Sequence, residues 1–321
     1  MRAYIVRRLL LVIPTLFLVS LIVFFGMRLI PGDIVDILVE MSRGLASGSA
    51  PPTRAEVAHS MGLDLPIYVQ YWQWMGNIIL HGDFGMSYWK HIPVIDDILI
   101  RLPVTFELAF LALVVAQIIA LPIGIYSALR QDTWGDYIGR SFAILCIAVP
   151  GFWLGTLIIV FPSIWWGYMP PIRLIHFTDD PLGNLQMFII PAIVLGMAMA
   201  GGTMRMTRTM MLEVLRQDYI RTAWAKGLRE RVVILRHALK NALIPVVTMI
   251  SIWVPFLIGG TVIIEQIFSL PGMGRLVIDS ALRRDYPLVS GVMLVLAVIL
   301  VFVNLVVDIT YALLDPRVHY K

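Results

Sequence analysis

Charged residues are scarce in this chain. Of its 321 residues only 14% are Asp, Glu, Lys or Arg, whereas 59% are hydrophobic, and the mean hydropathy is +0.84. In soluble domains about a quarter of the residues are charged and about half are apolar. The composition therefore excludes an ordinary soluble domain and predicts an integral membrane protein.

Groups that carry chemistry are also few. Cys146 is the single cysteine, so the chain can form no disulfide within itself. The six histidines lack the short helical spacing of a metal site, and the sequence contains neither a phosphate-binding G-x-x-x-x-G-K-[S/T] loop nor a G-x-S-x-G nucleophile motif. We therefore expect no enzyme activity, no cofactor and no metal site in this chain.

Six apolar runs are long enough to cross a hydrocarbon core of about 30 Å, which takes roughly 20 helical residues. Each run has to be helical, because a helix satisfies the backbone groups of one segment inside lipid. The first run is expected to be an uncleaved span, since no small-residue cleavage pattern follows it closely. The sequence predicts an all-α membrane protein whose transmembrane helices lie at residues 9–30, 105–129, 138–165, 185–204, 242–268 and 287–314.

The distribution of basic residues predicts the topology. Most of the 25 Lys and Arg residues precede the first run, follow the second or fourth run, or end the chain. Because such residues are retained on the cytoplasmic side, both termini are expected in the cytoplasm. The net charge of +4 then reflects topology and indicates no nucleic-acid partner. The expected organisation is an N-terminus with the first helix (1–30), an extracytoplasmic segment (31–103) and a five-helix core (104–321).

The extracytoplasmic segment contains the stretch PIYVQYWQWMGNIIL, in which apolar residues recur near helical spacing. We expect an amphipathic helix at the membrane interface, where Trp and Tyr are favoured. A further role of this helix in receiving a periplasmic partner is left open by the spacing.

Proline and glycine interrupt several of the apolar runs. Proline removes a helix hydrogen bond and glycine lets two helices approach closely, so both suit a bent and moving pathway. Ordinary kinked packing is the alternative at each position. Few polar residues occur at membrane depth, where an ion-driven transporter would be expected to carry them. The hinge or pathway candidates are Pro150, Gly151, Gly201, Gly202, Gly259 and Gly260.

A dense basic segment, DYIRTAWAKGLRERVVILRHALKNALIPVV, begins at Asp218 between the fourth and fifth runs. Lys226 followed by Gly227 is typical of a helix that ends with a cation in its last turn and glycine in the left-handed cap position. A second short helix is expected to begin near Arg229 or Glu230. The segment therefore predicts a helix, a glycine turn and another helix.

The apolar positions of this segment suggest two faces. On one continuous helix, Leu212, Leu215, Tyr219 and Ala223 would form a stripe against the chain's own spans, and Val232, Leu235, Leu239 and Ala242 would do so on the second helix. Ile220 and Trp224 would lie on the opposite side, beside arginines. This second ridge predicts docking into a partner protein, and a loop packed entirely on its own chain is the alternative.

The segment YIRTAWAKG, followed by RHALKNALIPVV, closely resembles the cytoplasmic EAA loop of ABC importer permeases, in the form found in the dipeptide/oligopeptide/nickel permease family. Three further stretches resemble the same family: RRLLLVIPTLFLVSLIVFFGMRLIPGD, GLDLPIYVQYWQWMGNIILHGDFGMSY and EQIFSLPGMGRLVIDSALRRDYPLVSG. The general consensus begins Glu-Ala-Ala, whereas Arg221, Thr222 and Ala223 stand here. This departure, like the late Pro245, resembles the peptide subfamily.

The resemblance implies a type I importer permease fold with six transmembrane helices and a coupling loop at about 207–240. It implies ATPase contacts at Asp218, Tyr219, Arg221, Ala223, Trp224, Lys226 and Gly227. The other segment to which it assigns a family motif is an extracytoplasmic loop with Pro271, Gly272, Gly274 and Arg275.

The resemblance also implies partners. They are a homologous second permease, two ABC ATPase subunits that hold ATP and Mg²⁺, and a periplasmic or lipid-anchored solute-binding protein in or at a bacterial inner membrane. Family members carry dipeptides, longer peptides, nickel chelates, opines or oligosaccharides, and di- or oligopeptides are expected here. The competing interpretations are a stand-alone carrier or channel whose basic loop only fixes topology, and an intramembrane enzyme.

Overall fold

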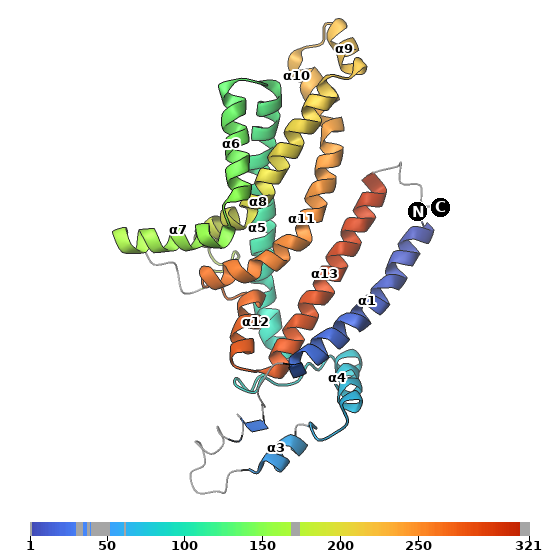
Figure 1. The fold of residues 1–321 in the computed structure, drawn as a ribbon, viewed down its shortest axis with the longest axis vertical. Coiled ribbons are helices and arrows are strands. Elements are labelled where there is room, and N and C mark those ends of the chain that lie inside the picture. The colour runs from blue at the N-terminus through green and yellow to red at the C-terminus, as the bar shows by residue number, and fades with distance from the viewer. Residues whose placement is uncertain are drawn as a thin grey trace. The chain divides into compact units, whose positions relative to one another are not determined.

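The computed structural model describes residues 2–29, 35, 36, 39, 52–60, 62–167 and 174–314. Within them the regular secondary structure is helical, apart from one isolated bridge between Met86 and Pro93 (Figure 1). The helices are α1 (Arg2–Leu29), α3 (Arg54–Ser60), α4 (Ile67–His81), α5 (Val94–Leu129), α6 (Trp134–Ala148), α7 (Gly151–Trp166), α8 (Pro181–Leu215), α9 (Asp218–Ala225), α10 (Glu230–Val232), a π-helical turn η1 (Val233–Ala238), α11 (Leu239–Ile267), α12 (Met273–Leu282) and α13 (Tyr286–Leu314).

Five stretches of the described chain are helical, long and apolar enough to cross a membrane: Val6–Leu29, Val94–Leu129, Pro181–Leu215, Glu230–Ile267 and Tyr286–Ile309. A sixth span is formed if α6 and α7 count as one, although they meet at an angle of 93°. The prediction of six helices agrees with this count when α6 and α7 are taken as one sharply bent span.

The bend between α6 and α7 has a local cause. Proline lacks an N–H and disfavours the helical conformation of the residue before it. Val149 accordingly has φ −85° and ψ 119°, and α7 begins at Gly151, directly after Pro150. The prediction of one continuous helix over 138–165 is wrong for this reason. A bend exists at the candidate hinge Pro150–Gly151, and a hinge motion there stays a prediction.

Helix α5 also differs from the expected span, because it begins at Val94 rather than near residue 105. Its first turn carries Asp96 and Asp97, and acidic side chains stabilise the N-terminal end of a helix. The predicted start followed apolarity alone and therefore missed this polar turn.

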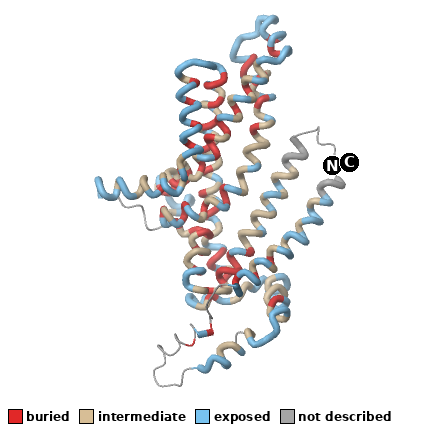
Figure 2. The backbone as a smooth tube through the Cα atoms, viewed as in Figure 1, coloured by how far each residue is buried: buried red, intermediate tan, exposed pale blue. Residues whose placement is uncertain are grey.

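Contacts divide the chain into two compact units. The first consists of Met1–Leu10, Arg101–Arg275 and Leu300–Lys321, and the second of Leu11–Ile100 and Leu276–Ile299. In the first unit α8 is the central helix: 61% of its most apolar window is buried, against 11–28% for the other four spans (Figure 2). Small residues allow this close packing, since a Cβ on Gly196 would stand 2.6 Å from the Ala112 carbonyl oxygen.

The second unit contains the helix expected from PIYVQYWQWMGNIIL, which is α4. Tyr71 on α4 is buried, its hydroxyl lies 2.8 Å from Ser20 Oγ of α1, and its ring meets Phe24 edge-on. Trp72, its neighbour, is 61% exposed. The amphipathic helix is therefore present, and its position at a membrane interface stays a prediction.

Candidate functional site

The basic loop, residues 216–240, begins where α8 ends at Leu215. Gln217 has extended backbone angles, φ −71° and ψ 148°, and precedes α9 as its N-cap. Helices α8 and α9 are therefore separate, whereas the predicted apolar stripe assumed one helix through both. This break at residues 216–217 changes the direction in which every α9 side chain points.

The buried face of α9 consists of Ile220, which is fully buried, and Ala223, which is 7% exposed. Both belong to a cluster that also contains Ala128, Met211, Val233, Ile234, Ala238 and Ala242. The prediction that Ile220 faces a partner protein is therefore wrong: it packs on its own chain. Trp224, the other half of the predicted ridge, is 44% exposed, and so is Tyr219 at 43%.

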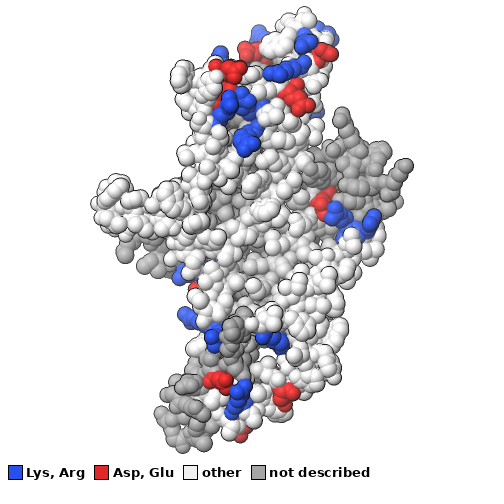
Figure 3. Space-filling view, in the orientation of Figure 1, with Lys and Arg blue, Asp and Glu red and all other residues white. Residues whose placement is uncertain are grey.

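The outer face of α9 combines aromatic and charged side chains. Tyr219 and Trp224 flank the buried face on its two sides, about 140° apart at 100° per residue, and Asp218, Arg221 and Lys226 lie on the outside between them; all five are exposed. The Arg221 guanidinium lies 3.4 Å from the Asp218 carboxylate, an exposed pair that contributes little to stability. In Figure 3 charged side chains gather over the end of the first unit that carries α9 and α10. These residue types suit contact with another protein.

Gly227 ends the α9 segment as predicted. It follows Lys226, has φ +72°, and donates its N–H to the Trp224 carbonyl at 2.9 Å. Among the described atoms none lies within 4 Å of the position a Cβ would take. Glycine is needed here because its backbone is left-handed, and not because space is short.

The second helix begins at Glu230, as expected, but its buried face differs from the predicted one. Val233, Ile234 and Ala238 are buried, whereas Leu235 is 50% exposed. The difference arises because Val233–Ala238 forms a π-helical turn, in which the angle between successive side chains is smaller than in an α-helix. The Asn241 amide on α11 donates to the Tyr219 hydroxyl at 2.8 Å and so connects α9 to α11.

At the far end of α11 lies a second glycine-dependent segment, Leu270–Arg275, which we call the PGMG turn. It folds around the carboxylate of Glu265, which is fully buried. The Thr105 hydroxyl donates to Glu265 Oε1 at 2.6 Å, and the Arg275 N–H donates to Oε2 at 3.1 Å. The same hydroxyl accepts the Met273 N–H at 2.8 Å. One side chain on α5 and one on α11 thus hold the turn.

The two glycines of the PGMG turn are required for space. A Cβ on Gly272 would overlap the Glu265 carboxylate, and one on Gly274 would overlap the backbone of Val262. Arg275 donates from Nη1 to the Ser269 carbonyl at 2.7 Å. The sequence motif is therefore a tightly packed turn, and sequence reasoning missed Glu265 and Thr105. The available signal was a carboxylate in an apolar run just before P-G-x-G.

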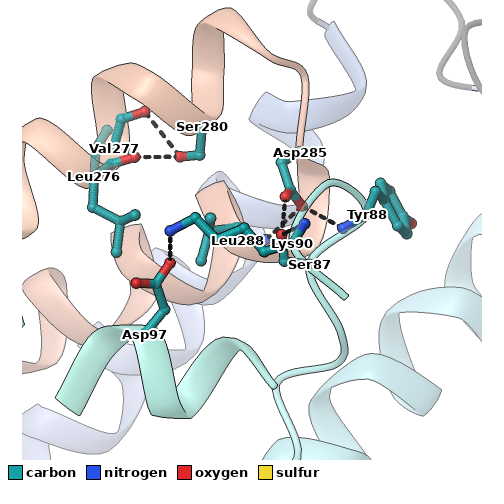
Figure 4. Close-up of polar contacts among 9 residues, drawn as sticks. All are labelled: Ser87, Tyr88, Lys90, Asp97, Leu276, Val277, Ser280, Asp285 and Leu288. Carbon is teal, nitrogen blue, oxygen red and sulfur yellow. Dashed lines mark hydrogen bonds and ion pairs between the residues drawn. The ribbon is translucent and has the colours of Figure 1, made fainter. Parts of the chain in front are cut away.

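The second unit holds a buried carboxylate of its own (Figure 4). Asp285 is 1% exposed, accepts the Ser87 hydroxyl and the Tyr88 N–H, and caps the start of α13 through the Leu288 N–H. Burial, together with the negative charge of Asp285, raises the pKa of the Tyr88 phenol. Lys90 is ion-paired with Asp97 nearby. These contacts join the segment after α4 to the start of α13, and no sequence pattern predicted them.

The predicted hinge glycines fall into two groups. A Cβ on Gly201 would stand 2.6 Å from the Ala143 carbonyl oxygen, one on Gly202 2.8 Å from Met249, and one on Gly260 2.9 Å from Leu195. Gly259 has no described atom within 4 Å of that position. Three of the four therefore serve close helix packing, and a role in a pathway stays a prediction for all four.

Two family models match the chain. The model of the binding-protein-dependent transport system inner membrane component covers residues 120–320, and the N-terminal model of the same transport components covers residues 1–109. The chain belongs to this family. It is therefore a membrane transport subunit and not an enzyme, and the resemblance drawn from the four sequence stretches is confirmed.

Curated relatives match this permease along its whole length. A putative peptide transport system permease of Brucella suis biovar 1 (strain 1330) is 41% identical over 100% of both chains. An oligopeptide transport system permease of Bacillus subtilis (strain 168) is 40% identical over 100% of both, and a glutathione transport system permease of Escherichia coli (strain K12) is 38% identical over 99% of both.

A solved structure shares the fold. The crystal structure of an amino acid ABC transporter with histidines superposes with a TM-score of 0.50 at 13% identity and covers 67% of this chain and 93% of that chain. At this identity the likeness concerns the fold alone. It confirms the all-α permease architecture expected from the sequence.

Proposed function

We propose that this permease is one half of the translocation pathway of an ATP-driven importer for di- or oligopeptides in a bacterial inner membrane. A homologous second permease supplies the other half. Two ATPase subunits hold ATP and Mg²⁺ and bind the basic loop, and a periplasmic or lipid-anchored protein delivers the solute. Both termini and the basic loop face the cytoplasm in this proposal, and the segment between α1 and α5 lies outside.

The observation that carries the coupling role is the two-sided construction of α9. Ile220 and Ala223 fix the helix on the chain's own core, while Tyr219 and Trp224 stay exposed on either side of that buried face and Arg221 is exposed on the outside. An amphipathic helix that already has a buried face and still exposes aromatic residues is suited to enter a groove of another protein. Closure of the ATPase pair would push on this outer face.

The roles of the individual residues follow from their positions. Tyr219 and Trp224 supply apolar contact area, while Asp218, Arg221 and Lys226 supply charge around it. Aromatic residues and arginine dominate the binding energy of most protein interfaces. Ala223 keeps α9 close to the helices beneath it, and Gly227 lets the chain turn back toward α11.

The proposed solute rests on the relatives. Those described above are named as permeases for peptides, oligopeptides and glutathione, and glutathione is itself a short peptide. A peptide is therefore the solute class that the relatives share. The extracytoplasmic binding protein would select among peptides, since it meets the solute first.

A stand-alone carrier is the competing function, and one observation favours it: Ile220 is buried in its own chain and so does not contribute to an outer ridge. An ion-driven carrier, however, needs acidic groups available at membrane depth. Asp308 is paired with Arg8 at 2.8 Å, and Glu265 accepts the Thr105 hydroxyl. Both carboxylates already have structural partners, so neither is a free acidic group of the kind that an ion-driven carrier needs.

The test is retention of ATPase subunits on the purified permease pair. Trp224→Ala removes the largest side chain of the outer face, and truncating a central Trp in an interface typically costs about 2 kcal/mol or more. That corresponds to a roughly 30-fold weaker affinity. We expect ATPase retention to fall accordingly, measured by quantitative co-purification from membranes.

Trp72→Ala on α4 is the matched control, because Trp72 is also exposed but belongs to the segment proposed to lie outside. This variant is expected to retain the ATPases. Unchanged retention in Trp224→Ala would remove the coupling role from α9. Nucleotide-independent, gradient-driven peptide uptake by vesicles that contain this chain alone would establish the carrier instead.

A further inference from the structure

A buried ion pair ties the turn between α5 and α6 to α8. Asp136, in the first turn of α6, is fully buried. Arg208 on α8 donates from Nε to Oδ1 and from Nη2 to Oδ2, both at 2.7 Å. The N–H of Asp132, in the turn itself, donates to Oδ2 at 3.1 Å. Two parallel guanidinium–carboxylate bonds fix orientation as well as distance.

The three helices around this pair touch closely, pair by pair. A Cβ on Gly124 of α5 would stand 2.8 Å from the Met204 carbonyl oxygen of α8. A Cβ on Gly139 of α6 would overlap the Ser127 hydroxyl of α5, and Gly201 of α8 packs on the backbone of α6. Glycine lets each pair of helices approach closely. The three contacts close a triangle of helices, with the ion pair near one end.

The same end carries the support of α9. Met211 lies three residues after Arg208 on α8 and is fully buried in the cluster that receives Ile220 and Ala223. Ala128, from the last turn of α5, belongs to that cluster too. The ion pair and the apolar cluster beneath α9 are therefore adjacent along α5 and α8. This cluster contains no residue of α6. Helix α6 is connected to the cluster through its contacts with α5 and α8 and through the ion pair.

We propose that Asp136 and Arg208 are positioning residues that make α6 move as one body with α8 and α9. This inference rests on the proposed function, in which an ATPase displaces α9. Apolar helix faces can slide past one another, whereas separating this pair would break two charge-assisted bonds and leave an uncompensated buried charge. Displacement of α9 would thus reach α6 and, beyond the 93° bend, α7.

Distance measurements between two spin labels test this inference. In a Cys146→Ser background, labels replace Ile144, which is 60% exposed on α6, and the exposed Arg229 in the basic loop. The complex with its ATPases is held in nanodiscs, first without nucleotide and then trapped with ATP and vanadate. One rigid body predicts a single narrow distance distribution that is the same in both states.

Asp136→Asn keeps the shape of the side chain and removes its charge. We expect a broader distribution without nucleotide and a shifted one after trapping, because α9 then moves without α6. Arg205→Asn, on an exposed residue three positions before Arg208 on α8, is the control and should behave as the unaltered chain does. Where Asp136→Asn yields no folded protein, Arg208→Lys replaces it, since lysine keeps the charge but loses the two-pronged geometry.

Two results would overturn the inference: a distance that changes on trapping in the unaltered chain, or a variant distribution as narrow as that of the unaltered chain in both states. Failure of the proposed function has a different signature, which is that no ATPase co-purifies with the unaltered chain. In that case the widths of the distance distributions without nucleotide, compared between the unaltered chain and Asp136→Asn, still decide whether the ion pair holds α6 to α9.

Discussion

The two turns that flank α11 both depend on glycine, for opposite reasons. In the basic loop, Gly227 has a left-handed backbone, and none of the described atoms comes near the place of its missing side chain. In the PGMG turn, Gly272 and Gly274 are not left-handed, but a Cβ on either would collide with Glu265 or Val262. The basic loop needs backbone freedom, whereas the PGMG turn needs space.

The polar contacts of the two turns also differ: the ion pair of the basic loop is exposed, whereas the carboxylate around which the PGMG turn folds is buried. The Asp218–Arg221 pair is exposed, and such pairs contribute about 0–1 kcal/mol. The Glu265 carboxylate is buried, and a buried polar group that loses its partner costs about 1–3 kcal/mol, or more when it is charged. Stability depends on the contacts of the PGMG turn, while the outer side chains of the basic loop are left for other surfaces.

Filling the space in the PGMG turn should destabilise the chain more than any other change in the two turns. Gly274→Val would place methyl groups against the backbone of Val262, which cannot move without shifting α11. Overpacking of this kind costs about 3 kcal/mol. We expect a strong loss of monodisperse protein after extraction and a lower unfolding temperature for what remains, measured by tryptophan fluorescence.

Gly259→Val, earlier on α11, is the matched control for that variant. No described atom lies within 4 Å of its Cβ position, so the added side chain has room. It should leave yield and unfolding temperature nearly unchanged. If both variants lost yield and unfolding temperature equally, valine would be harmful anywhere in this region. Lack of space would then not be the reason for glycine at position 274.

A smaller effect on stability is expected at Gly227. Valine at φ +72° would store about 1–3 kcal/mol of strain in the turn. Because no packing is disturbed, membrane insertion and yield should survive, while ATP hydrolysis by the assembled complex loses its dependence on the solute-binding protein. ATPase rates in nanodiscs with and without the peptide-loaded binding protein measure this.

Gly227→Asn separates strain from side-chain volume. Asparagine tolerates the left-handed region better than other residues with a Cβ. It should therefore keep most of the regulated ATP hydrolysis that Gly227→Val loses. If both variants lost it equally, the backbone conformation of residue 227 would not be the reason for glycine there.

The predictable features are those that depend on residues close in sequence. Apolar runs gave the spans, and Lys226 before Gly227 indicated a left-handed helix end that the structure contains. Pro150 marked the bend, but the angle of 93° depends on what α7 packs against and so could not be derived from it. Local signals thus located the elements and their ends.

The missed features depend on residues that are distant in sequence. Glu265 and Thr105 are 160 residues apart, and Asp136 and Arg208 are 72 apart. The buried side of α9 was mistaken because one extended residue, Gln217, breaks the helix and no glycine or proline marks it. The periodicity of apolar residues cannot reveal a single extended residue. That residue nevertheless sets the direction of α9, and with it the side chains that a partner can reach.

A single hydroxyl group contributes to each of the two turns, and its removal should change stability by the smallest amount. Tyr219→Phe removes the acceptor of the Asn241 amide, an exposed hydrogen bond for which water can substitute, so the free energy of unfolding should fall by about 0.5 kcal/mol. Thr105→Val removes the hydroxyl that serves both Glu265 and Met273 in a buried site, and its loss should be several times larger. Denaturant unfolding of the two variants under the same conditions gives both values. If the free energy of unfolding fell by similar amounts in the two variants, the contacts of the basic loop would hold it as firmly as those of the PGMG turn hold that turn. Helix α9 would then be no more available to an ATPase than a buried turn is.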